Sequence, residues 1–199
     1  MAPANLARRG WSLVLAVGLV TGLHGYVVMV ERGTGSVWNP GQVFIEFLFG
    51  PSPMLQDGGT WNDSAHQALE AWNESMTVLE LVGAPGSGPA GTRDNGKNEA
   101  FFSATVFGQT FGPNTAAVTL VTRAGWPRER NQEADVIFNS AFAWDSYRGA
   151  RQQRDGAPLL DFHRVALHEF ICWGWITRMS TIPPANRRSW TPPSGTSTP

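Results

Sequence analysis

The chain has 199 residues, of which 42% are apolar and 16% are charged, with 22 glycines and 14 prolines. This length fits a single domain, and the apolar content is sufficient to bury a core, which excludes wholesale disorder. The formal net charge of −1 gives no support for a nucleic-acid partner. Because Cys172 is the single cysteine, an internal disulfide and a cluster of zinc-bound thiolates are both excluded.

An export signal is expected at residues 1–25. Arg8 and Arg9 precede an uncharged stretch from Trp11 to Leu23, which is typical of a secretory signal peptide. The alternative is a membrane anchor, because the 20 residues from Trp11 to Val30 reach the length of a span. The rest of the chain is therefore predicted to be secreted or extracytoplasmic, with a membrane contact only if this segment stays uncleaved.

The body of the chain, residues 26–170, carries several strand patterns. Residues 43–49 are aromatic and β-branched and end at Gly50-Pro51, which is typical of a strand. Further strands are predicted at 101–107, 117–122 and 134–138, and loops are predicted at 83–96 and 147–158.

Two helices are predicted in the body. Apolar residues recur at helical spacing from Trp61 to Leu79, and the start has three candidate caps, Asn62, Asp63 and Ser64. A second helix follows Asp161, which can cap it, and carries Phe162, Val165, Ala166 and Phe170 on one side. The order strand, helix, several strands, helix indicates an α+β fold.

The second helix carries the pair His168-Glu169, which is the first half of the pattern His-Glu-x-x-His. In that pattern two histidines four residues apart bind zinc from one helix face, and the glutamate acts as general base on the metal-bound water. A solvated His-Glu pair on a helix surface is the alternative explanation for these two residues.

The surroundings of this pair resemble those of a known enzyme family. Residues 134–139, which read Ala-Asp-Val-Ile-Phe-Asn, then Trp144, then residues 161–170 resemble the matrixin-like branch of the metzincin zinc proteases. The resemblance implies a twisted mixed β-sheet with a long helix and an active-site helix. It also implies a secreted, monomeric zinc endopeptidase that hydrolyses a polypeptide substrate, with His168 as first zinc ligand and Glu169 as general base.

The chain departs from the family pattern after Phe170. The family continues Gly-His-x-Leu-Gly-x-x-His, which supplies two more zinc ligands, whereas no histidine follows His168 in this chain. Cys172 stands where the second ligand belongs, and Arg178 stands where the third belongs. A chain that lacks two of three ligands is expected to be inactive, because catalytic zinc needs three protein ligands and a water.

The genetic code offers an explanation for the departure. If codons after Phe170 are read in a shifted frame, the permitted residues include His-Leu-Leu-Gly-Leu-Asp-His, and a Leu, the Gly and the Asp are forced. We therefore expect that bases were lost after Phe170, either in the gene or in its sequencing. Residues 171–199, which contain no Asp or Glu, are then an out-of-frame tail that is predicted to be disordered.

Other interpretations stay open. His168 and Cys172 lie four residues apart and could form a His-Cys metal site, although no motif places His24, His66 or His163 beside them. Asp135 and Asp145 could bind calcium, since matrixin relatives often carry it, but solvated or capping roles are preferred.

A non-enzymatic binding module is a further alternative. Three tryptophans, Trp38, Trp126 and Trp144, could stack on sugars, and packing in the core or in loops is the competing explanation for each.

Overall fold

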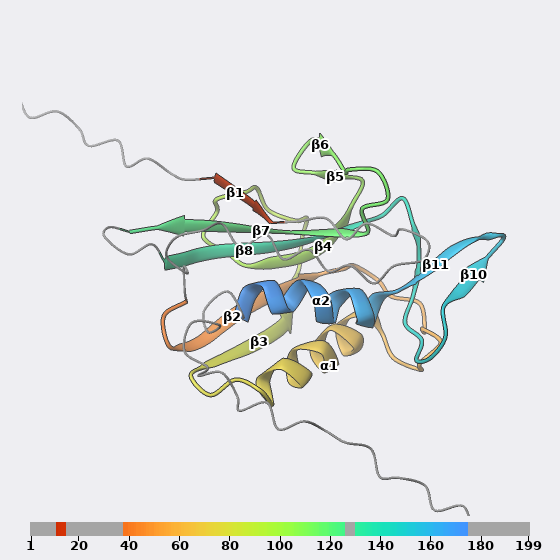
Figure 1. Ribbon diagram of the computed structural model, residues 1–199, viewed down its shortest axis with the longest axis horizontal. Coiled ribbons are helices and arrows are strands. Elements are labelled where there is room, and N and C mark those ends of the chain that lie inside the picture. The colour runs from red at the N-terminus through yellow and green to blue at the C-terminus, as the bar shows by residue number, and fades with distance from the viewer. Residues whose placement is uncertain (1–10, 15–37, 126–129, 175–199) are drawn as a thin grey trace, which may run out of the picture.

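The structure is a computed structural model that describes residues 11–14, 38–125 and 130–174. It shows a mixed α/β fold in which two helices cover one face of a six-stranded sheet (Figure 1). Most of the expected export signal and residues 175–199 of the expected tail, Arg178 included, lie outside the described residues. Among the helices described, none is long and apolar enough to cross a membrane.

The main sheet has the strand order β1-β7-β8-β4-β2-β3. Its members are β1 (Trp11–Val14), β2 (Gly41–Leu48), β3 (Leu79–Pro85), β4 (Glu99–Ser103), β7 (Ala117–Ala124) and β8 (Arg130–Asn139). Strands β3, β2, β4 and β8 run parallel to one another, and β7 pairs antiparallel with β8. The predicted strands at 43–49, 117–122 and 134–138 are confirmed. The strand predicted at 101–107 is β4, which ends at Ser103.

The first strand lies in the segment that is expected to be an export signal. Trp11–Val14 pairs antiparallel with the far edge of β7, from Trp11 opposite Thr122 to Val14 opposite Thr119. Four residues that the sequence patterns assign to a signal therefore add a strand to the sheet.

Helix α1 spans Trp61–Asn73, and its cap differs from the predicted ones. Thr60 is the N-cap: its hydroxyl accepts from the backbone N–H of Asp63, whose carboxylate accepts from Thr60 N–H, which makes a capping box. The predicted caps Asn62, Asp63 and Ser64 therefore lie inside the helix, and that prediction was wrong. The helix also ends earlier than predicted, because Leu79 already belongs to β3.

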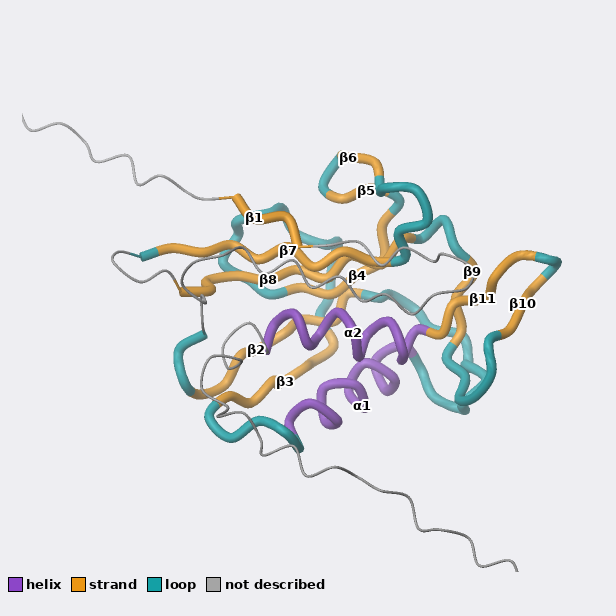
Figure 2. Tube along the Cα trace, viewed as in Figure 1, coloured by secondary structure: helices purple, strands orange, loops and turns teal. Residues whose placement is uncertain are grey.

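The main core lies between the sheet and the two helices (Figure 2). Inward-facing residues of β2, Val43, Ile45 and Phe47, pack in one cluster with residues of both helices. At Gly83 in β3, an added Cβ would lie 2.2 Å from the Phe47 ring, so only glycine permits this approach.

The opposite face of the sheet is covered only in part. Phe101, Ile137 and two residues of β7 form a second cluster there, under Phe107 and Phe111. Phe107 belongs to the turn of a hairpin made by β5 (Thr105–Val106) and β6 (Gln109–Thr110). We call this side of the sheet the outer face, and the side that carries the helices the helix face.

A three-stranded sheet leads into the second helix. It consists of β9 (Ala143–Asp145), β10 (Gln152–Arg154) and β11 (Ala157–Asp161), in the order β10-β11-β9. The predicted loop at 147–158 therefore contains a short hairpin, which the polar sequence concealed. Because β11 ends at Asp161, it delivers the chain directly to helix α2 (Phe162–Gly174).

Candidate active-site helix

Helix α2 is held against the sheet by a stripe of apolar residues. Phe162, Ala166 and Phe170, four residues apart, are fully buried in the main core. The helix begins directly after Asp161, as predicted, but Asp161 Oδ1 has no hydrogen-bond partner among the described residues. Helix α2 contacts β7 and β8. The packing of its apolar stripe therefore fixes the directions in which the side chains of residues 168 and 169 point.

The carboxyl group of Glu169 is buried against β7. Its side chain is 0% exposed, and the hydroxyl of Thr119 donates to Oε2 over 2.6 Å. The second oxygen, Oε1, has no hydrogen-bond partner among the described residues. Burial raises the pKa of Glu169 to about 7, against the opposing effect of the Thr119 hydrogen bond. A carboxyl group that titrates near neutrality is suited to proton transfer, although this one has no exposed surface.

His168 precedes this glutamate and is half-buried. Burial lowers the pKa of His168, which favours the neutral imidazole at pH 7. Neutral imidazole is the form that binds metals, so the protonation state agrees with the predicted role as a ligand.

The remaining candidate ligands are distributed over other parts of the fold. The backbone of Cys172 lies in α2, one turn after His168, as the predicted spacing requires. His163 Nδ1 lies 3.1 Å from the carbonyl oxygen of Ser64, where it links α2 to α1. The His66 ring lies edge-on to Phe47 at 5.0 Å between centroids, and His24 lies outside the described residues.

A zinc site of the expected kind does not fit the residues described. Within residues 11–14, 38–125 and 130–174, no group of three His, Cys, Asp or Glu side chains is arranged to hold a metal ion. His168 therefore supplies only one of the three protein ligands that a catalytic zinc requires.

Asp135 belongs to a cluster of buried carboxyl groups on the outer face, which the sequence patterns did not reveal. Glu133 accepts from the backbone N–H groups of Asp94 and Gly96, and Glu99 accepts from that of Gly91. These carboxylates anchor the loop from Gly91 to Asn98 to the sheet. Glu99 lies beside Asp135 because β4 and β8 pair in parallel. The spacing of residues along the sequence does not predict which strands pair.

The pKa of Asp135 is raised strongly in this cluster. Its Oδ1 accepts from the backbone N–H of Glu99 at 3.1 Å. Burial, and then the charge of Glu133, raise the pKa of Asp135 to about 8. Backbone N–H donors surround these carboxylates, which matches an anchoring role better than calcium binding.

Asp145 is also committed to structural contacts. Its carboxylate accepts from the backbone and side chain of Gln56 and from Ser146 N–H, and it pairs with Arg154 at 3.0 Å. The hydrogen bonds to Gln56 and Ser146 and the charge of Arg154 hold the pKa of Asp145 below its ordinary value, although burial opposes them. These contacts give Asp145 a structural role, since its carboxylate joins the loop at Gln56 and strand β10 to the end of β9.

The tryptophans that could stack on sugars differ in their surroundings. Trp144 packs on Phe102, Phe138 and Phe162, and its indole N–H donates to the carbonyl oxygen of Asn139 over 2.8 Å. Core packing therefore explains Trp144. Trp38 packs against the main core and also lines a groove, and Trp126 lies outside the described residues.

Comparison with known proteins adds no assignment: no protein-family model matches the chain, and no curated protein matches it significantly.

Proposed function

We propose that the chain is a secreted metalloendopeptidase of the matrixin-like metzincin type by descent, and that it is inactive as written. The observation that carries the proposal is the placement of Glu169, a buried carboxyl group with a pKa of about 7, directly after the neutral His168 on α2. A carboxyl group with a pKa near 7 is suited to proton transfer, although that of Glu169 has no exposed surface in this chain, and its neighbour is in the form that binds zinc.

The aromatic contacts around α2 support the proposal further. The three segments that carry the family resemblance meet in one cluster, although they are separated in sequence. Phe138 of β8 lies 5.7 Å from Trp144 and 4.7 Å from Phe162 between ring centroids. The sequence pattern thus corresponds to one packed unit that fixes the start of α2.

The missing ligands support the second half of the proposal. The described part of the chain brings no group of three candidate ligands together, so zinc is expected to bind weakly or not at all at His168. We therefore derive no reaction through a metal for this chain. The polypeptide substrate is inferred from the family resemblance alone.

Zinc content and casein cleavage test the proposal on two chains. The chain as written should contain no stoichiometric zinc by mass spectrometry and should leave casein intact. A repaired chain has the shifted frame restored after Phe170, so that Gly and His follow it. This repaired chain should bind zinc and cleave casein until a chelator is added.

Two matched variants sharpen this test. In the repaired chain, Glu169→Gln should retain zinc and lose cleavage, because only the proposed base is changed. In the chain as written, Cys172→Ser should leave the metal content unchanged. Stoichiometric zinc and chelator-sensitive cleavage by the unrepaired chain would contradict the proposal, and loss of its metal in Cys172→Ser would establish the His-Cys site instead.

Secretion is tested separately. We expect the mature protein to appear outside the cytoplasm and to begin near residue 26 by N-terminal sequencing. Recovery of the intact N-terminus in the membrane fraction would favour the anchor instead.

A further inference from the structure

The outer face of the sheet is open over β2 and β3. Phe44 of β2 is 62% exposed there, whereas Val43 and Ile45, on either side of it, are buried in the main core. Single exposed apolar side chains are common on protein surfaces, so the position of Phe44 is informative only together with the hollow that it lines. The rest of the outer face, over β4, β7 and β8, is covered. The second core cluster lies there, and residues of the hairpin of β5 and β6 pack on it.

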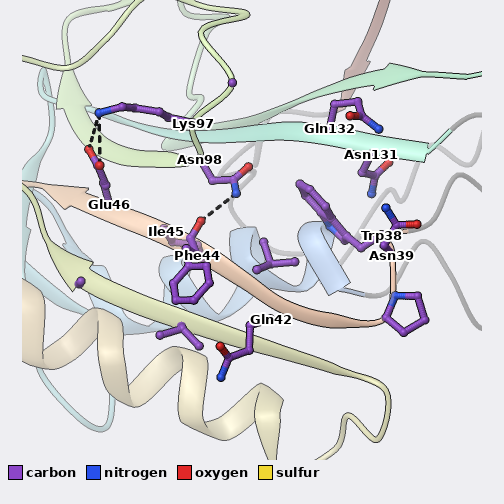
Figure 3. A pocket seen from close by; sticks show the side chains of 15 residues that line it. Trp38, Asn39, Gln42, Phe44, Ile45, Glu46, Lys97, Asn98, Asn131 and Gln132 are labelled. Carbon is purple, nitrogen blue, oxygen red and sulfur yellow. Dashed lines mark hydrogen bonds and ion pairs between the residues drawn. The ribbon is translucent and has the colours of Figure 1, made fainter.

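A groove of about 640 Å³ lies on this open part of the face (Figure 3). Its size falls within the range of small-molecule sites, which is several hundred Å³. It is bordered by β2, by β3, by the loop that carries Gly96–Asn98 and by the start of β8.

Two aromatic side chains give the groove its apolar surface. The exposed ring of Phe44 stands beside Val82, its partner in the register of β2 and β3, and Ala84 also lines the groove. The half-buried indole of Trp38 lies at the other end, where it also packs against the main core (Figure 3). Flat apolar surfaces of this kind suit the apolar face of a ring-shaped ligand.

The polar lining consists mainly of amide side chains. Asn39 and Gln132 are exposed amides, each with donor and acceptor atoms. The amide of Gln42 donates to Glu80 over 2.8 Å, which fixes its orientation. Such groups match hydroxyl and acetamido groups, which also donate and accept.

The charges of the groove cancel. Lys97 Nζ lies 3.3 Å from Glu46 Oε1, and both side chains line the groove. A strongly charged ligand would find no unpaired charge of opposite sign in this pair, so a neutral ligand is the better match.

The groove is held in shape by Asn98. Its amide donates to the carbonyl oxygen of Phe44 over 2.8 Å, and its Oδ1 accepts from the backbone N–H of Ala134. Because Asn98 joins the loop to two strands, little ordering is needed when a ligand binds.

We propose that this groove binds a neutral oligosaccharide. Phe44 and Trp38 stack on the sugar rings, and the amides of Asn39, Gln42 and Gln132 bind the hydroxyl or acetamido groups. The lining of this site includes neither His168 nor Glu169, so it can be tested separately from the proposed protease activity.

Calorimetry on the full chain tests the proposal, with the trimers of N-acetylglucosamine and of glucose as probes. One of the two should bind, and added chelator should not change the affinity. Phe44→Ala should raise the Kd roughly tenfold, as expected for loss of a central aromatic contact. Gln132→Ala should raise it by a smaller factor.

Met54→Ala is the matched control. Met54 is 84% exposed and does not line the groove, so its removal should leave the Kd unchanged. Far-UV circular dichroism should show that all variants are folded. Absence of binding to both trimers, equal weakening by Met54→Ala, or preference for a heparin fragment or a proline-rich peptide would overturn the proposal.

Discussion

Glu169 and Asp135 are both buried carboxyl groups with raised pKa values, but they lie on opposite faces of the same sheet. On the helix face, Glu169 accepts a hydrogen bond from the side chain of Thr119, and burial is the main cause of its pKa of about 7. On the outer face, Asp135 adjoins the carboxyl groups of Glu133 and Glu99, and burial together with these charges gives a pKa of about 8.

A raised pKa therefore does not by itself identify a catalytic group. Asp135 has the larger shift, yet its neighbours hold a loop to the sheet through backbone hydrogen bonds. The carboxylate of Glu169 instead accepts from one hydroxyl group, and it follows a half-buried histidine on a helix. The surroundings of each carboxyl group, more than its pKa, indicate its role.

A substitution in the core of the helix face should destabilise the fold most. Phe162→Ala should lower the free energy of unfolding by about 3–5 kcal/mol, because it leaves a cavity among aromatic rings. The Phe162 ring contacts those of Phe49, Trp61 and Phe138, among others. Urea unfolding measures the change, with Met54→Ala as an exposed control. A loss below about 1 kcal/mol would show that packing does not position α2.

The next effect concerns the outer face and depends on pH. The ordinary pKa of an aspartate is 3.8, whereas the pKa of Asp135 in the folded chain is about 8. At a pH between these two values, Asp135 is protonated in the folded chain and ionised in the unfolded chain. Its contribution to stability is therefore present at low pH and is lost as pH rises, by at most about 1.4 kcal/mol per pH unit.

Asp135→Asn should remove this dependence. The variant should be at least about 2 kcal/mol more stable than the parent at pH 8 and close to it at pH 4, because the amide carries no charge to desolvate. Urea unfolding across this range measures both slopes. Parallel slopes for parent and variant would show that Asp135 is not the buried group that titrates.

A smaller effect is expected for the partner of Glu169. Thr119→Val keeps the shape of the side chain but removes the hydroxyl donor, so Glu169 loses its side-chain hydrogen bond. The free energy of unfolding should fall by about 1–2 kcal/mol. Thr119→Ser retains the hydroxyl and should be closer to the parent in the same urea titration. If Thr119→Val keeps the stability of the parent while Thr119→Ser loses it, the methyl group matters and the hydrogen bond does not.

The smallest effect is expected for the exposed ion pair of the outer face. Lys97→Ala removes the contact with Glu46, in which both side chains are about half exposed. Such pairs contribute less than about 0.5 kcal/mol, so thermal unfolding should barely change. A clear loss that disappears in high salt would instead place this pair among the interactions that hold the loop.

The sequence was most informative where apolar periodicity is strong. The strand at residues 43–49 and the helix after Asp161 were predicted because their buried faces repeat every two or four residues. Thr60 was missed as a cap because three other polar residues follow Trp61, and only backbone geometry decides among them. The hairpin of β10 and β11 was missed because Gln152–Arg154 has the composition of a polar loop.

For the candidate site, the sequence located His168 and Glu169 but not their surroundings. Thr119 lies 50 residues before Glu169, and only the packing of α2 on β7 brings them together. The same is true of the outer face, where Phe44, Lys97 and Gln132 come from three separate segments. Contacts of this kind depend on strand order, which local patterns do not encode.

The pairing of β1 with β7 has a consequence for maturation. If residues 1–25 leave the protein as an export signal, Trp11–Val14 leave with them, and the outer edge of β7 loses its hydrogen-bonded neighbour. Unpaired backbone groups at a sheet edge readily accept another extended chain. While residues 11–14 remain attached, β1 covers this edge of β7, and their removal would expose it.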